Sequence, residues 1–153
     1  MITRGRAVLY SLGLITSLVL AACATGPKHS EMKSAIRELE SGAGRIYFYR
    51  TSVYGAAYSA EIKLNGTPVG SAVSKGFFFV DRKPGSYKVA VGSQENAINL
   101  TLNAGQTLYV RTSIVGFFPV LNWIASIIDD ATAKGEINDL SYVGGDLSPP
   151  GAK

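Results

Sequence analysis

The chain of 153 residues carries 15 Lys and Arg against 11 Asp and Glu, which gives a formal net charge of +4 at pH 7. Arg4 and Arg6 lie in a segment that we expect to be removed, and without them 13 basic residues face 11 acidic ones, a balance that argues against a nucleic-acid partner. The single cysteine excludes a disulfide within the chain, and the length fits one domain.

Residues 1–22 are typical of a signal peptide. A basic start is followed by residues 7–22, which contain no charge and form a run too short to span a bilayer comfortably. The run ends in Leu20-Ala21-Ala22-Cys23, which resembles the lipobox of bacterial lipoproteins. We therefore expect cleavage before Cys23 and a diacylglycerol on its thiol, which anchors the chain to a membrane. The alternative is an uncleaved signal anchor in which Cys23 is a passive small side chain.

The residue after Cys23 bears on localisation. It is Ala24 and not an aspartate, which in lipoproteins of the enterobacterial type favours retention in the inner membrane. We expect a lipid-anchored protein at the outer membrane that faces the periplasm. Residues 23–43 should form the lipidated cysteine, a polar tether and a short helix over Glu31–Glu40, because apolar residues recur there at helical spacing.

From Gly44 onward the apolar residues alternate with a period of two, which predicts β-strands. Turn pairs such as Asn65-Gly66 and Pro84-Gly85 separate them. The expected fold class is mainly β, a small antiparallel β-sandwich over residues 44–143, with residues 144–153 as a disordered tail. The expected strands, in chain order, are Gly44–Arg50, Glu61–Leu64, Val69–Val73, Gly76–Val80, Tyr87–Val91, Ile98–Leu102 and Leu108–Arg111.

The alternation ends at Gly116, and the apolar residues that follow Pro119 recur at helical spacing. This spacing predicts a C-terminal helix within Phe117–Ile128. Two interpretations are open: the helix covers an open end or edge of the sandwich, which we prefer, or it docks on a partner or a membrane surface. The candidate face comprises Val120, Trp123, Ile124 and Ile127.

The sequence offers few groups for catalysis. His29 is the only histidine and falls in the expected tether, Cys23 is assigned to lipid, and no phosphate-binding glycine motif is present. Asp129-Asp130 is interpreted as a solvated turn and not as a cation site. We therefore expect no enzyme, no cofactor and no metal. A set of aromatic and basic residues has two interpretations: they occupy ordinary strand positions, or they form a face that binds a glycan or a peptide. The set is Tyr47, Tyr49, Tyr54, Tyr58, Tyr87, Tyr109, Arg50 and Arg111.

Several short motifs occur in a recognisable order: Gly44 to Arg50, Asn65-Gly66, Pro84 to Tyr87, and Ala104 to Arg111. In this order they resemble the bacterial domain of unknown function 2846, which is found largely in secreted lipoproteins, and the segment Asp129–Ile137 resembles its closing turn and strand. The resemblance implies a small β-sandwich of the accessory-module kind and brings no catalytic residues. The tryptophan-bearing segment Phe117–Ile128 departs from the family pattern.

These observations favour a non-enzymatic binding or structural module of the cell envelope, with the membrane as a partner through the lipid and an envelope protein or a glycan as a second partner. The alternative is a subunit of an envelope secretion or transport assembly that docks through Phe117–Ile128. A hydrolase is the least supported class, because the usual general bases are missing from the expected domain.

Overall fold

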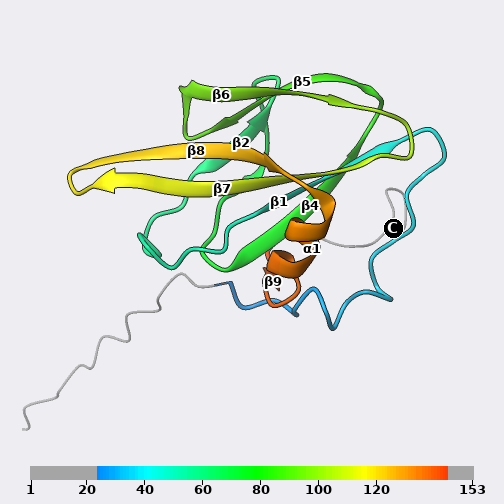
Figure 1. The fold of residues 1–153 in the computed structure, drawn as a ribbon, viewed down its shortest axis with the longest axis horizontal. Coiled ribbons are helices and arrows are strands. Elements are labelled where there is room, and N and C mark those ends of the chain that lie inside the picture. The colour runs from blue at the N-terminus through cyan, green and yellow to red at the C-terminus, as the bar shows by residue number, and fades with distance from the viewer. Residues whose placement is uncertain (1–23, 145–153) are drawn as a thin grey trace, which may run out of the picture.

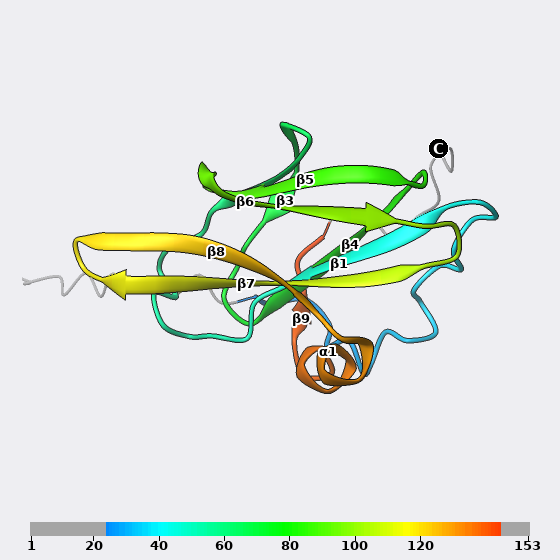
Figure 2. The ribbon, with the colours of Figure 1, turned by 45° about the horizontal axis from the view of Figure 1, so that its top comes forward.

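The computed structural model describes residues 24–144. The expected signal peptide, Cys23 and nearly all of the expected tail lie outside the described residues. Within them the chain forms two packed β-sheets and a helix near the C-terminus (Figures 1 and 2). The mainly β fold and the two-sheet sandwich are thereby confirmed.

One sheet has five strands in the order β8-β7-β1-β4-β9, and the other has four in the order β3-β2-β5-β6, counted over the described residues. The five-stranded sheet contains β1 (Gly44–Tyr49), β4 (Gly76–Arg82), β7 (Thr107–Phe117), β8 (Val120–Ile128) and β9 (Ser141–Tyr142). The four-stranded sheet contains β2 (Glu61–Leu64), β3 (Thr67–Ser71), β5 (Gly85–Val91) and β6 (Ser93–Leu102). Each of the seven expected strands overlaps one of these.

The sandwich is not purely antiparallel. The first strand pairs antiparallel with β4 but parallel with β7, where Arg45 lies opposite Thr107, and β9 pairs parallel with β4. The chain leaves β1, builds the second sheet and returns to the far side of β1, and such a crossover can place neighbours in the same direction. The alternation of apolar and polar residues within a strand does not indicate whether that strand pairs parallel or antiparallel with its neighbour.

Both faces of the five-stranded sheet are covered, which explains why β1 is buried over its whole length. Ile46 and Phe48 point into the core between the sheets, whereas Tyr47 and Tyr49 point to the outer face. The outer face is covered by residues 28–40 and by helix α1 (Asp130–Ile137). The segment before the sandwich therefore belongs to the packed structure.

The helix expected in Phe117–Ile128 is wrong. Val120–Ile128 is strand β8, which forms a long hairpin with β7 in which Phe117 lies opposite Val120. The hairpin projects beyond the sandwich, at the left in Figures 1 and 2. A strand with apolar residues on both faces loses its alternation, and here this produced a spacing that resembles a helix.

The helix near the C-terminus is instead α1, where the family resemblance implied a turn and a strand. Asp129 caps it, because its carboxylate accepts a hydrogen bond from the backbone N–H of Thr132 at 2.9 Å. The helix expected over Glu31–Glu40 is also wrong. That stretch is a series of turns, in which Met32 is nevertheless buried against the outer face of the sheet. None of the helices in residues 24–144 is long and apolar enough to cross a membrane.

Candidate functional site

A cavity of about 340 Å³ lies on the outer face of the five-stranded sheet, between the N-terminal segment and α1. Its volume is at the lower end of the range found for small-molecule sites. We call it the His29 cavity. Its lining residues are His29, Lys33, Tyr47, Tyr109, Lys134 and Asn138.

Two tyrosines supply the aromatic part of the wall. Tyr47 of β1 and Tyr109 of β7 are direct neighbours in the parallel register, and their rings stack with centroids 5.1 Å apart and planes 17° apart. Burial raises the pKa of both hydroxyls, that of Tyr109 to about 12. Both hydroxyls are therefore protonated near neutral pH and can donate hydrogen bonds.

His29 is held by aromatic rings. Its imidazole meets Phe77 edge-on at 5.2 Å and Tyr47 at 6.0 Å between centroids. Burial, and to a lesser degree the charge of Lys33, lowers its pKa, so the ring is neutral at pH 7. Its Nδ1 is buried and has no hydrogen-bond partner in the part of the chain that the structure describes. A ligand in the cavity could supply one.

The charge of the lining is positive. Lys33 comes from the N-terminal segment and Lys134 from α1, where it also pairs with Asp130 at 2.7 Å. The lining residues include no carboxylate, serine or cysteine that could act with His29 as a nucleophile or orienting group. The arrangement suits recognition of a small anion that can also hydrogen-bond to the tyrosine hydroxyls.

A buried ion network fastens the N-terminal wall of the cavity. The guanidinium of Arg45 donates two hydrogen bonds to the carboxylate of Asp81, at 2.6 and 2.8 Å, and a third to the backbone oxygen of Arg37. Arg37 itself donates to Asp81 at 3.2 Å. Burial opposes the charge on Asp81, but the hydrogen bonds and charges of Arg45 and Arg37 outweigh this and lower its pKa.

A second network fastens the helical wall. Glu136 of α1 accepts a hydrogen bond from the Tyr49 hydroxyl at 2.7 Å and one from the Arg111 guanidinium at 2.6 Å. Tyr49 and Arg111 are opposite each other on β1 and β7. The tyrosine and arginine residues considered as one binding face are therefore divided: Tyr47 and Tyr109 line the cavity, while Tyr49 and Arg111 hold its wall.

The remaining members of that set lie elsewhere. Arg50 is fully buried at the end of β1 and donates hydrogen bonds to the backbone oxygens of Tyr54, Gly55 and Tyr58, so it shapes the loop after β1. Burial lowers its pKa. Tyr54 and Tyr58 are about half exposed on this loop. Tyr87 is in the four-stranded sheet and donates its hydroxyl hydrogen to the backbone oxygen of Lys83.

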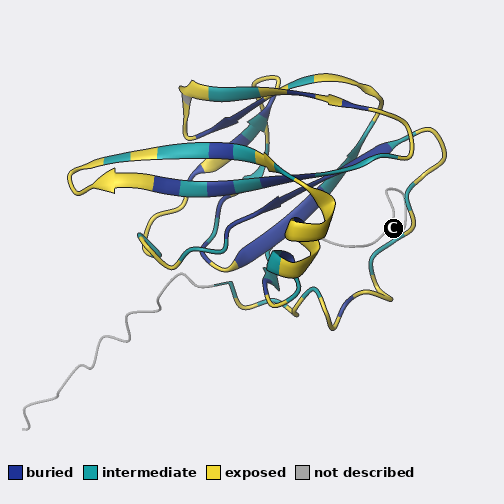
Figure 3. Ribbon diagram, in the orientation of Figure 1, coloured by how far each residue is buried: buried dark blue, intermediate teal, exposed yellow. Residues whose placement is uncertain are grey.

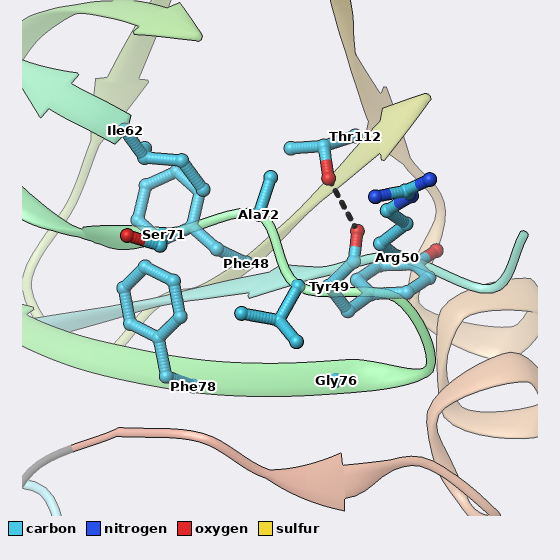
Figure 4. Close-up of a pocket in the computed structure, with 10 residues that line it drawn as sticks. Phe48, Tyr49, Arg50, Ile62, Ser71, Ala72, Gly76, Phe78 and Thr112 are labelled. Atoms are coloured by element: carbon cyan, nitrogen blue, oxygen red, sulfur yellow. Dashed lines mark hydrogen bonds between the residues drawn. The ribbon is translucent and has the colours of Figure 1, made fainter. Parts of the chain in front are cut away.

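The interior next to Arg50 is filled. Figure 4 shows Thr112 donating to the Tyr49 carbonyl, a bond of 3.2 Å, beside a recess lined by Phe48, Phe78 and others. The Phe48 and Phe78 rings stack at 5.2 Å, and the recess has no volume for even a water molecule. It is not a ligand site.

The candidate face of four residues is split by the strand geometry. Trp123 and Ile127 lie opposite Ile114 and Val110 and so share the inner face of the hairpin, whereas Val120 and Ile124 point outward. Trp123 packs on the core between the sheets, and the Arg50 guanidinium lies 5.0 Å above its ring. Val120 is 66% exposed. Trp123 is thus partly buried, Ile127 is 48% exposed, and exposure prevails at the end of the hairpin (Figure 3).

Sequence reasoning missed the cavity as a whole. His29 was assigned to a tether, and Lys33, Lys134 and Asn138 carry no local pattern that sets them apart from ordinary surface residues. They meet because two segments at opposite ends of the described chain pack on the same sheet face. The available signal was the pair of tyrosines on β1, Tyr47 and Tyr49, and Tyr109 on β7. In residues 24–144 no group of three or more His, Cys, Asp or Glu residues is arranged to hold a metal ion.

Comparison with known proteins confirms the family resemblance. The model of the family described as "Protein of unknown function (DUF2846)" matches residues 40–120, and the chain belongs to this family. An uncharacterized protein of Haemophilus influenzae is similar to it, with 27% identity over 101 residues. The match covers 62% of this chain and 60% of that relative's length. No solved structure matches the chain.

Proposed function

We propose that this protein is a lipid-anchored, non-enzymatic module of the bacterial cell envelope, facing the periplasm at the outer membrane, which binds a small anionic ligand in the His29 cavity. The lipobox-like sequence before Ala24 supports the anchor. The residues after it fold onto the sandwich and contribute His29 and Lys33 to the cavity wall. This shared use of one segment is the observation that carries the proposal.

An acidic sugar is the ligand class that the lining fits best. Two lysines attract a carboxylate, and Asn138 and the tyrosine hydroxyls can hydrogen-bond to the hydroxyl groups of a sugar. A neutral sugar would make no use of the positive charge of Lys33. A simple anion would make little use of the tyrosine hydroxyls and Asn138.

The anchor is tested by mass spectrometry of the mature chain from membranes. We expect a diacylglycerol on Cys23, and we expect Cys23→Ser to leave an unprocessed precursor. Separation of inner and outer membranes then tests localisation. A mature chain that starts elsewhere, or carries no lipid, would contradict the proposal.

The cavity is tested with glucuronate as the probe, glucose as the neutral control and acetate as the ringless anion. Because His29 is the only histidine, its imidazole resonances report the cavity without ambiguity. A bound anion should raise the pKa of His29. We expect glucuronate to do so most strongly, with a loss of affinity of roughly tenfold in Lys33→Ala. Lys88→Ala, on the exposed part of β5, is the matched control. An unchanged pKa with glucuronate would refute the ligand class.

The alternative function is a subunit of an envelope assembly that docks through the Phe117–Ile128 segment. The exposed end of the hairpin supports it, since Phe117 and Phe118 are 85% and 78% exposed. It differs from the main proposal in requiring a protein on that surface.

A further inference from the structure

Most of the large apolar side chains that are exposed in residues 24–144 gather at one end of the sandwich; Ile127 is the exception. The first strand pairs with β7 only as far as Arg111, whereas β7 pairs with β8 as far as Phe117, so the hairpin continues past the last supporting strand. Beside it lies the loop after β1. Large apolar residues exposed in these two segments are Val53, Tyr54, Tyr58, Val115, Phe117, Phe118 and Val120, which we call the apical patch.

Beyond Arg111 the hairpin carries no charged residue. From Thr112 to Ile128 there is no Asp, Glu, Lys, Arg or His. Soluble surfaces normally intersperse charges, and an uncharged, aromatic end marks an interaction with another protein or with a membrane. Phenylalanines at the extreme end, with tyrosines behind them, match the order in which these side chains enter a bilayer interface.

The apical patch is joined by hydrogen bonds to the start of the described chain. The backbone N–H of Ala24 donates to the Ser74 oxygen at 3.3 Å, and the buried Ser74 hydroxyl donates to the Ser52 oxygen at 3.0 Å. Two residues further on, the Tyr54 hydroxyl donates to the Gly116 oxygen at 2.8 Å. In Figure 1 the start of the described chain, the loop and the hairpin end follow one another along the lower left of the molecule.

The arrangement is well supported. Arg50 holds the loop through three carbonyl groups, and a Cβ added at Gly55 would lie only 2.8 Å from the Ile114 side chain, so loop and hairpin pack closely. Lys75, next to Ser74, is exposed at the same end and can face lipid phosphates. Since Ala24 directly follows Cys23, a lipid on that cysteine brings this end of the sandwich to the membrane.

We propose that the apical patch is a second membrane contact, in which the end of the β7–β8 hairpin enters the lipid interface beside the acyl chains on Cys23 and fixes the orientation of the domain. The proposal rests on the lipid anchor of the proposed function. A membrane is favoured over a protein partner because the patch lies at the anchored end. The His29 cavity, on the outer sheet face, then stays open to the periplasm.

The test uses the full chain, reconstituted in phosphatidylcholine vesicles with and without brominated acyl chains, which quench tryptophan within the bilayer. Trp123 is replaced by Phe, and a single tryptophan is introduced by Phe118→Trp or, as the matched control, by Lys83→Trp, which is exposed on the β4–β5 connection at the other end of the sandwich. We expect blue-shifted emission and loss of intensity in brominated vesicles for the first and neither change for the second.

A further variant separates insertion from mere proximity. Phe117→Asp in the Phe118→Trp background should abolish quenching while lipid remains on Cys23, because a charge opposes entry into the bilayer. Both phenylalanines are exposed, so these variants should keep the circular dichroism of the parent. A lipidated Phe118→Trp variant that emits as in water overturns the inference, leaves the proposed function intact and favours a protein partner. Absence of lipid on Cys23, read from its mass, overturns both.

Discussion

Asp81→Asn should be one of the most destabilising substitutions of a charged residue in the domain. The side chains of Asp81 and Arg45 are 9% and 7% exposed, and the substitution leaves the Arg45 guanidinium buried without a counter-charge. Breaking a buried pair from one side costs about 3 kcal/mol or more. For a domain of this size that corresponds to a fall in melting temperature of roughly 10 °C.

The matched control is Glu61→Gln, the same change of acid to amide in an exposed pair with Lys63, whose atoms are 2.9 Å apart. It should cost at most about 0.5 kcal/mol. Urea unfolding followed by circular dichroism measures both. The double variant Arg45→Met with Asp81→Leu should lose less stability than the sum of its single changes, because no unpaired charge remains.

The pH dependence has a defined sign. Because the pKa of Asp81 is lowered in the folded protein, the ion pair contributes stability above about pH 4, the ordinary aspartate value, and this is lost as the pH falls through the lowered value. Asp81→Asn should flatten the acid limb of the profile of unfolding free energy against pH.

Equal free energies of unfolding for Asp81→Asn and Glu61→Gln would refute the reasoning, since the buried network would then contribute no more than a surface pair.

Three further outcomes follow from packing. Trp123→Ala should cost about 2–3 kcal/mol, less than for a fully buried tryptophan, and the native emission should be blue-shifted by the apolar core; water-like emission would contradict this. Gly70→Ala should destabilise by about 1–3 kcal/mol, because its Cβ would lie 2.4 Å from the Phe78 ring, and a neutral effect in thermal unfolding would show that the ring moves freely. Gly135→Ala meets open space within α1 and should stabilise by about 0.5–1 kcal/mol in the same assay; a loss would contradict the helix assignment.

The strands of the sandwich were predictable because burial on one or both faces leaves a clear mark in the sequence. Glu61–Leu64 alternates cleanly and is bounded by Asn65-Gly66, whose φ values of 50° and 82° require residues that tolerate the left-handed region. The core of the sandwich follows from such segments. The family resemblance rested on the same strands.

The elements that the sequence did not predict correctly, and the cavity that it did not predict, have a different origin. Strand β8 (Val120–Ile128) carries apolar residues on both faces: Trp123 packs on the core, whereas Val120 lies on the opposite face, so the alternation is lost. Helix α1 buries only Ala133 and Ile137, too few for a periodic stripe, although its cap at Asp129 was readable. The His29 cavity depends on parallel pairing of β1 and β7, which sets Tyr47 beside Tyr109. Distant pairing of this kind leaves no local trace.

The central position of β1 also governs the order of folding. Strand β1 comes first in the chain and lies between β4 and β7. Ile46 therefore has both of its neighbours in the sheet only after Val80 and Leu108, which come later in the chain, have been made. Closing such distant pairs costs chain entropy before the contacts compensate for it, which slows folding. A nascent chain that ends before β7 lacks one neighbour of its central strand and cannot complete the five-stranded sheet. The five-stranded sheet can therefore close only after β7 has been made.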